Sequence, residues 1–151
     1  MGAEAKLAEL GITVPEVVPP VAAYQPTART GNLVFTAGQL PAHNGEMLAV
    51  GKLGGEVTEE QGYECARQCA LNALAAVKAE IGSLDDVKRV VKVVVFVAST
   101  PDFTGQPKVA NGASELLGKV FGESGKHARS AVGVAALPLD VPVEVEIVVE
   151  V

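Results

Sequence analysis

The residues best suited to chemistry lie near the C-terminal end, where Arg129 precedes a valine-rich run that carries Glu144, Glu146 and Glu150. A guanidinium can grip a carboxylate through two parallel hydrogen bonds and so orient a small acid. The alternative for Arg129 is an ordinary surface salt bridge. The alternative for the glutamates is a solvated strand face, unless a second subunit covers that face and raises the pKa of a buried carboxyl.

Other kinds of active site find little support in the sequence. There is no Walker loop, dinucleotide fingerprint, HExxH or GxSxG motif, and His43 and His127 are far apart. Cys65 and Cys69 share one face of an expected helix, where we interpret them as reduced packing residues, because a metal site would need more ligands. We therefore expect neither a metal nor a cofactor.

Composition limits the class of protein further. The 151 residues suit one domain, and 48% hydrophobic with only 4% aromatic residues predicts a core of Val, Leu, Ala and Ile. A net charge of −6 without a Lys/Arg cluster among aromatics argues against nucleic acid as a main partner. No segment reads as a signal peptide or a membrane span, so we expect a soluble, cytoplasmic protein without a membrane partner.

Two amphipathic helices are expected to position these residues. Residues 58–82 give the clearer one, with Thr58 and Gln61 forming a capping-box pattern and Gly82 at its end. The second spans 109–122, and a short helix is expected before Gly11. The proline-rich stretch 13–26 should run extended.

Strands account for most of the remaining chain. We expect them at 33–36, at 47–53 after an Asn44-Gly45 turn, at 86–99, at 129–137 and at 141–151. The run 93–98 reads as a central strand covered on both faces. Alternation over 141–151 puts the odd-numbered residues, all valines except Ile147, on one face, and the three glutamates with Pro142 and Val148 on the other. A sheet with both helices on one face follows, and a second subunit is expected to hide part of the other face.

Several of these segments resemble the Rid/YjgF family, also known as endoribonuclease L-PSP. They are "NLVFTAGQLP", "VKVVVFVAS", the helix around Asn111 and "ARSAVGVAALPLDVPVEVEI". The most specific part is Arg-Ser-x-Val-x-Val-x-x-Leu-Pro, followed by Asp-Val and a Val-Glu-Val-Glu strand. The resemblance covers one domain, 21–151, after an N-terminal extension, 1–20. It implies an α+β fold like that of the small trimeric chorismate mutases, with a mixed sheet, two helices and a homotrimer with clefts between subunits.

The resemblance also implies an activity and its residues. Deaminating members hydrolyse 2-imino acids, or their enamine tautomers, to 2-oxo acids and ammonia. Arg129 would hold the substrate carboxylate, Glu144 would position the water, and Tyr24, Gly38 and Asn111 would line the cleft.

This chain departs from the deaminating pattern at three positions. It carries Ala37 where a serine is common, Ala131 where a cysteine is frequent, and Gly133 where a larger residue stands. A non-catalytic module that binds small 2-oxo acids is therefore an alternative, and which imino acid is preferred stays open. Ribonuclease activity is a further alternative, which the negative net charge does not favour. Chorismate mutase activity is another, but Arg129 is the single cationic residue in the C-terminal segment and gives little support for a dicarboxylate substrate.

Overall fold

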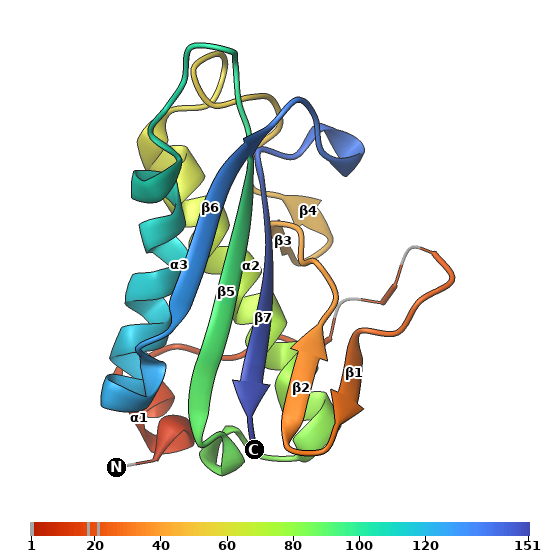
Figure 1. Ribbon diagram of the computed structural model, residues 1–151, viewed down its shortest axis with the longest axis vertical. Helices are drawn as coiled ribbons and strands as arrows, with labels where there is room; N and C mark the ends of the chain where they lie inside the picture. The colour runs from red at the N-terminus through yellow and green to blue at the C-terminus, as the bar shows by residue number, and fades with distance from the viewer. Residues whose placement is uncertain (1, 18, 21) are drawn as a thin grey trace.

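The computed structural model describes residues 2–17, 19–20 and 22–151. They form an α+β fold in which one five-stranded mixed sheet packs on helices (Figure 1). The strand order is β1-β2-β7-β5-β6, with only β5 and β6 parallel. The strands are β1 (Thr27–Thr30), β2 (Leu33–Thr36), β5 (Arg89–Ala98), β6 (Ala128–Val134) and β7 (Val143–Glu150).

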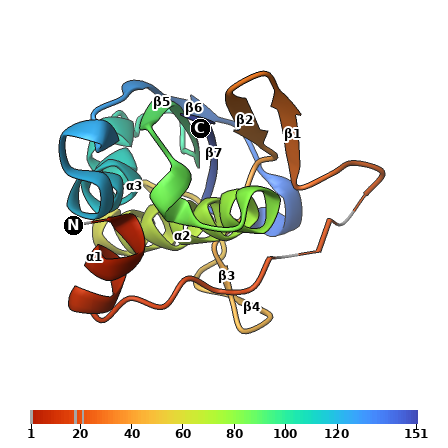
Figure 2. The same cartoon turned by 90° about the horizontal axis from the view of Figure 1, so that it is seen from below.

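Helices α2 (Glu59–Ile81) and α3 (Gln106–Phe121) both lie on one face of the sheet, as the sequence predicted (Figure 2). The capping box at the start of α2 is confirmed, since the Thr58 and Gln61 side chains each bond the other residue's backbone N–H. Helix α3 begins three residues earlier than expected, after Gly105 rather than at Val109.

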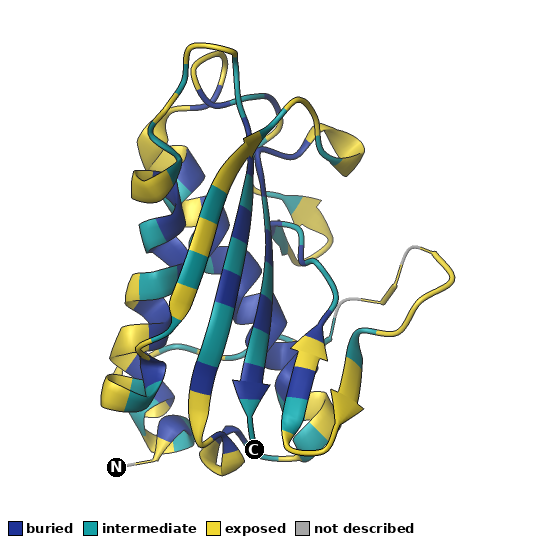
Figure 3. Cartoon of the chain, viewed as in Figure 1, coloured by how far each residue is buried: buried dark blue, intermediate teal, exposed yellow. Residues whose placement is uncertain are grey.

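The core lies between the sheet and these two helices. Strand β7 alternates as predicted, with Val143, Val145, Ile147 and Val149 fully buried and the intervening residues half-buried (Figure 3). Strand β5 lies inside the sheet between β7 and β6, whereas the middle strand is β7, and within one chain the helices cover only one face of β5. Val94 and Phe96 on the other face remain half-buried, so the expected cover on both faces is not provided by the chain itself.

We call that second side the open face of the sheet. Its cross-strand neighbours include Phe35 opposite Val148 and Glu144 opposite Phe96, which in turn lies beside Val132 on β6. Phe35 is 41% exposed and Val132 is 43% exposed. The open face therefore carries apolar side chains among its glutamates.

The N-terminal half differs most from expectation. The residues 47–53 do not return as a strand of the main sheet; instead β3 (Ala42–His43) and β4 (Glu46–Met47) form a two-residue hairpin around the predicted Asn44-Gly45 turn. On its other side from β7, β2 pairs with β1. The sequence did not reveal β1 because its residues are polar and mostly exposed. The predicted early helix is present as α1 (Ala3–Glu9), with Ala3 and Leu7 buried in the core.

Three short 3-10 turns complete the described structure: η1 (Leu84–Asp86), η2 (Gly122–Gly125) and η3 (Pro138–Asp140). Strand β6 ends at Val134, three residues before the predicted end, and the chain reaches β7 through η3. Leu139 and Asp140 in this turn both have positive φ, 59° and 58°.

Candidate active site

Arg129 lies on the edge strand β6, with its half-buried side chain turned towards helix α3. Its Nη1 donates to Asn111 Oδ1 at 2.8 Å and to Ser114 Oγ at 3.1 Å, and its Nη2 donates to the Pro107 carbonyl at 3.4 Å. Asn111 and Arg129, both expected at the site, are thus directly bonded. These bonds fix the guanidinium while leaving it N–H donors for a further acceptor.

Ser114 and His127 extend this group, and the sequence analysis did not assign either of them. His127 Nδ1 lies 2.6 Å from the Gly125 carbonyl, and its Nε2 lies 2.8 Å from Ser114 Oγ. Because a carbonyl only accepts, Nδ1 is the donor to Gly125, and in the tautomer with its proton on Nδ1 the ring accepts the Ser114 hydroxyl at Nε2. Ser114 Oγ is then oriented to accept from Arg129. Their spacing in the sequence could have indicated both residues. Ser114 follows Asn111 by three residues on a helix, and His127 precedes Arg129 by two residues at the start of a strand, so each shares a face with an expected site residue.

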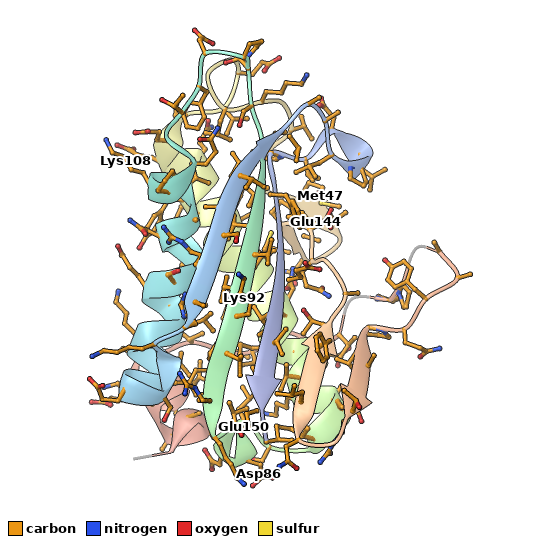
Figure 4. All side chains as sticks on the ribbon, viewed as in Figure 1. Met47, Asp86, Lys92, Lys108, Glu144 and Glu150 are labelled. Atoms are coloured by element: carbon orange, nitrogen blue, oxygen red, sulfur yellow. The ribbon has the colours of Figure 1, made fainter. Side chains whose placement is uncertain are left out.

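Glu144 lies on β7 and is half-buried on the open face (Figure 4). Burial, and secondarily the charge of Glu146, raises the pKa of the Glu144 carboxyl above its ordinary value of 4.5. Its Oε2 occupies the position that a Cβ on Gly38 would need. Glycine at 38 is therefore what allows the carboxylate to lie against the backbone there.

Glu144 opens into a hollow of about 480 Å³, which we call the Glu144 hollow. Its other lining residues are Ala22, Tyr24, Gln25, Ala37, Gly38, Leu40 and Pro138. Three of the expected site residues, Tyr24, Gly38 and Glu144, thus line one concave and mostly apolar space. Ala37 presents only a methyl group to it.

The structure therefore divides the five expected residues into two groups. Arg129 and Asn111 lie between β6 and α3, on the helix-covered side, whereas Glu144 lies on the open face. Strand β5 separates β6 from β7, so the two groups are also about 10 Å apart across the sheet. A single chain does not bring Arg129 and Glu144 together.

The remaining departures from the family pattern lie along β6 beside Arg129. Ala131 is half-buried and packs against the core, and a Cβ on Gly133 would lie 2.8 Å from Gln106 Nε2. Gln106 itself is held by bonds to Ser99 Oγ and the Phe103 carbonyl. The absence of a side chain at Gly133 therefore leaves room for Gln106 in the first turn of α3.

The described residues contain no group of three or more His, Cys, Asp or Glu side chains arranged to hold a metal ion. Cys65 and Cys69 are buried free thiols, and burial raises the pKa of Cys65 to about 11. Both therefore act as packing residues, as predicted. Within the same described part of the chain, no helix has the length and apolar character needed to cross a bilayer.

The sheet and its two covering helices form a chorismate-mutase-like fold, and the candidate site residues lie on both faces of its sheet. The family model described as "YjgF/chorismate mutase-like, putative endoribonuclease" matches residues 4–151. The chain belongs to this YjgF family, as the resemblance predicted.

Individual relatives agree over nearly the whole chain. Protein TCP17 of Trypanosoma cruzi is 46% identical, over 97% of this chain and 92% of that protein. A 2-iminobutanoate/2-iminopropanoate deaminase of Dermatophagoides farinae is 31% identical, over 91% of this chain and 93% of that protein. The crystal structure of Atu1372 from Agrobacterium tumefaciens, a protein of unknown function, superposes with a TM-score of 0.92 at 43% identity, covering 99% of this chain and 92% of that one.

Proposed function

We propose that the protein is an enamine/imine deaminase that hydrolyses 2-imino acids to 2-oxo acids and ammonia. The observation that carries this proposal is that the chain presents a fixed, half-buried guanidinium at Arg129 and, on the other face of the sheet, a half-buried carboxyl of raised pKa at Glu144. The first suits a substrate carboxylate, and the second suits a water molecule that must lose a proton. The deaminase from Dermatophagoides farinae among the relatives supports the same reaction.

In this mechanism Arg129 binds the carboxylate of the imino acid and orients its C=N carbon. The ionised Glu144 accepts a proton from a water molecule as the water oxygen bonds to that carbon. That proton passes to the imine nitrogen, which leaves a tetrahedral carbon bearing a hydroxyl and an amino group. Glu144 then takes the hydroxyl proton and gives it to the amino group, so that the C–N bond breaks and ammonia leaves as the carbonyl forms. Positioning supplies most of the acceleration, because the reactants are already held in order.

We further propose that each site is completed by two copies of the chain in a homotrimer. Arg129 and Glu144 lie on opposite sides of one sheet, so an Arg129 can approach a Glu144 hollow only if it comes from another copy. The exposed apolar residues of the open face, Phe35 and Val132 among them, support an interface there. Sedimentation equilibrium tests this assembly, and a purely monomeric protein at micromolar concentration would contradict it.

The activity is tested by ammonia release from imino acids that an amino acid oxidase generates in the same vessel. The native protein should accelerate hydrolysis, and Arg129→Ala should lower kcat/KM about 100-fold, since a charge-assisted bidentate contact is lost. Arg89→Ala is the matched control, because Arg89 is an exposed arginine at the far end of β5. Unchanged turnover in Arg129→Ala would remove the anchoring role.

A 2-oxo acid binding module is the second candidate. The methyl group of Ala37 in the Glu144 hollow favours it, because a hydroxyl common in deaminating members is missing beside Glu144. Titration calorimetry with pyruvate separates the two functions: binding without accelerated imine hydrolysis supports the module.

A further inference from the structure

A second, smaller hollow of about 70 Å³ adjoins the Glu144 hollow. The two share Tyr24, Gly38 and Leu40 as lining residues, so the smaller one continues the larger beyond the proposed reaction centre. Its further walls include Pro20, Met47 and Leu139. We call it the Leu139 hollow.

From this continuity we infer that the Leu139 hollow is a subsite for the side chain of the substrate, and that it selects 2-imino acids with a long or branched apolar side chain. The inference rests on the proposed function, since it assigns the reacting carbon to the Glu144 hollow. Most of the side chains that line the smaller space belong to proline, leucine, alanine and methionine, which offer burial rather than hydrogen bonds to a ligand. Of its two polar side chains, Tyr24 and Gln39, the second already donates to the Ala37 carbonyl at 3.2 Å.

The segment around Gly38 and Leu40, which both hollows share, is held by hydrogen bonds from α2 and from β7. Asn72 of α2 is 1% exposed and donates from Nδ2 to the carbonyls of Leu40 and Ala42, at 3.0 and 2.9 Å. Gln39 exchanges backbone hydrogen bonds with Val145 of β7, of 2.7 and 3.0 Å. The position of the subsite relative to Glu144 is therefore fixed by both neighbouring elements.

Leu139 forms a wall in a conformation that leucine seldom adopts. Its φ is +59°, the residue is 64% exposed, and the next residue, Asp140, also has positive φ. The turn is nevertheless anchored, because the Gly51 N–H donates to the Asp140 carbonyl at 2.8 Å. An apolar side chain held exposed at a strained position points to a ligand contact that offsets the cost.

Another wall comes from residues near the N-terminus, which the family model also matches from residue 4 onwards. Pro19 and Pro20 line the hollow from the N-terminal extension, whose helix α1 is secured on the core by the Lys78–Glu4 ion pair of 3.0 Å. The extension thus gains a function in this proposal: its proline segment closes the side-chain subsite.

The first test compares the binding of pyruvate and 4-methyl-2-oxopentanoate by titration calorimetry. The native chain should bind the branched acid about tenfold more tightly, since each methylene buried in an apolar pocket contributes to discrimination. Leu139→Asn should abolish this ratio, while asparagine tolerates the positive φ and preserves the turn. Equal affinity of the native chain for the two acids overturns the subsite.

The matched control is Leu48→Asn, which removes an exposed leucine next to Met47 that lines neither hollow. It should leave the ratio unchanged. If Leu139→Asn instead alters the sedimentation mass and leaves the ratio intact, the occupant is a second copy and the inference is wrong. Selective oxo-acid binding without imine hydrolysis would refute the deaminase while retaining the subsite.

Discussion

The Arg129 group and the Glu144 hollow are built in opposite ways. Arg129 is positioned by polar contacts, with hydrogen bonds to Asn111, Ser114 and the Pro107 carbonyl. Glu144 is positioned by the room that Gly38 leaves for its carboxyl group, within a mostly apolar hollow. In the proposed mechanism, the guanidinium that binds the substrate carboxylate is surrounded by hydrogen-bond partners, whereas the carboxyl that exchanges a proton is partly desolvated. Substitutions in the two groups should therefore change different kinetic parameters.

The largest effect is expected at Glu144. Glu144→Gln should lower kcat about 100-fold or more, because general-base catalysis is lost, while KM changes little because Arg129 still binds the carboxylate. Steady-state kinetics of imine hydrolysis measure both quantities. An equal change in KM would contradict the separation between the two groups.

The pH dependence sharpens the same prediction. Because burial raises the pKa of Glu144, the native rate should fall on acidification at a pH above the ordinary glutamate value of 4.5, and this limb should vanish in Glu144→Gln. The stability contribution of a raised carboxyl pKa is present at low pH and lost as pH rises through the folded value. Glu144→Gln should therefore raise the melting temperature at neutral pH but not in acid.

The next largest effect is expected where α3, which carries Asn111 and Ser114, packs against α2. A Cβ at Gly112 would overlap the Tyr63 carbonyl of α2 and lie 3.2 Å from the Arg67 nitrogen. Gly112→Ala should therefore push α3 from α2 and lower the free energy of unfolding by about 1–3 kcal/mol. Urea denaturation measures this change.

Gly118 provides the control within the same helix. No atom lies within 4 Å of a Cβ built there, so Gly118→Ala should stabilise α3 by about 0.5–1 kcal/mol. Similar losses in both variants would show that packing between the helices is not the cause.

The smallest effect is expected at Ser114. Ser114→Ala removes the bond between its hydroxyl and Arg129 and the bond to His127, so KM should rise about fivefold with kcat nearly unchanged. Ser114→Thr keeps the hydroxyl and should recover most of the affinity. A fall in kcat alone would show that Ser114 does not act by positioning the arginine.

Local patterns made much of the fold predictable. The capping box at Thr58, the turn at Asn44-Gly45 and the alternation over 143–150 each depend on residues near one another in sequence. Strand β1 was missed because its polar residues gain their strand conformation from pairing with β2. The early start of α3 was missed because Gln106 and Pro107 lie outside its apolar repeat.

The sequence by itself determined the residue types for chemistry, the amphipathic helices and the buried face of β7, because periodicity and capping are local properties. Only the tertiary structure decided that Asn111, Ser114 and His127 gather around Arg129, and that Glu144 lies against Gly38 on the opposite side of the sheet. These placements follow from strand order and register, which join residues such as Val145 and Gln39 that are distant along the chain. Side-chain contacts across elements arise from that packing, and no single segment encodes them.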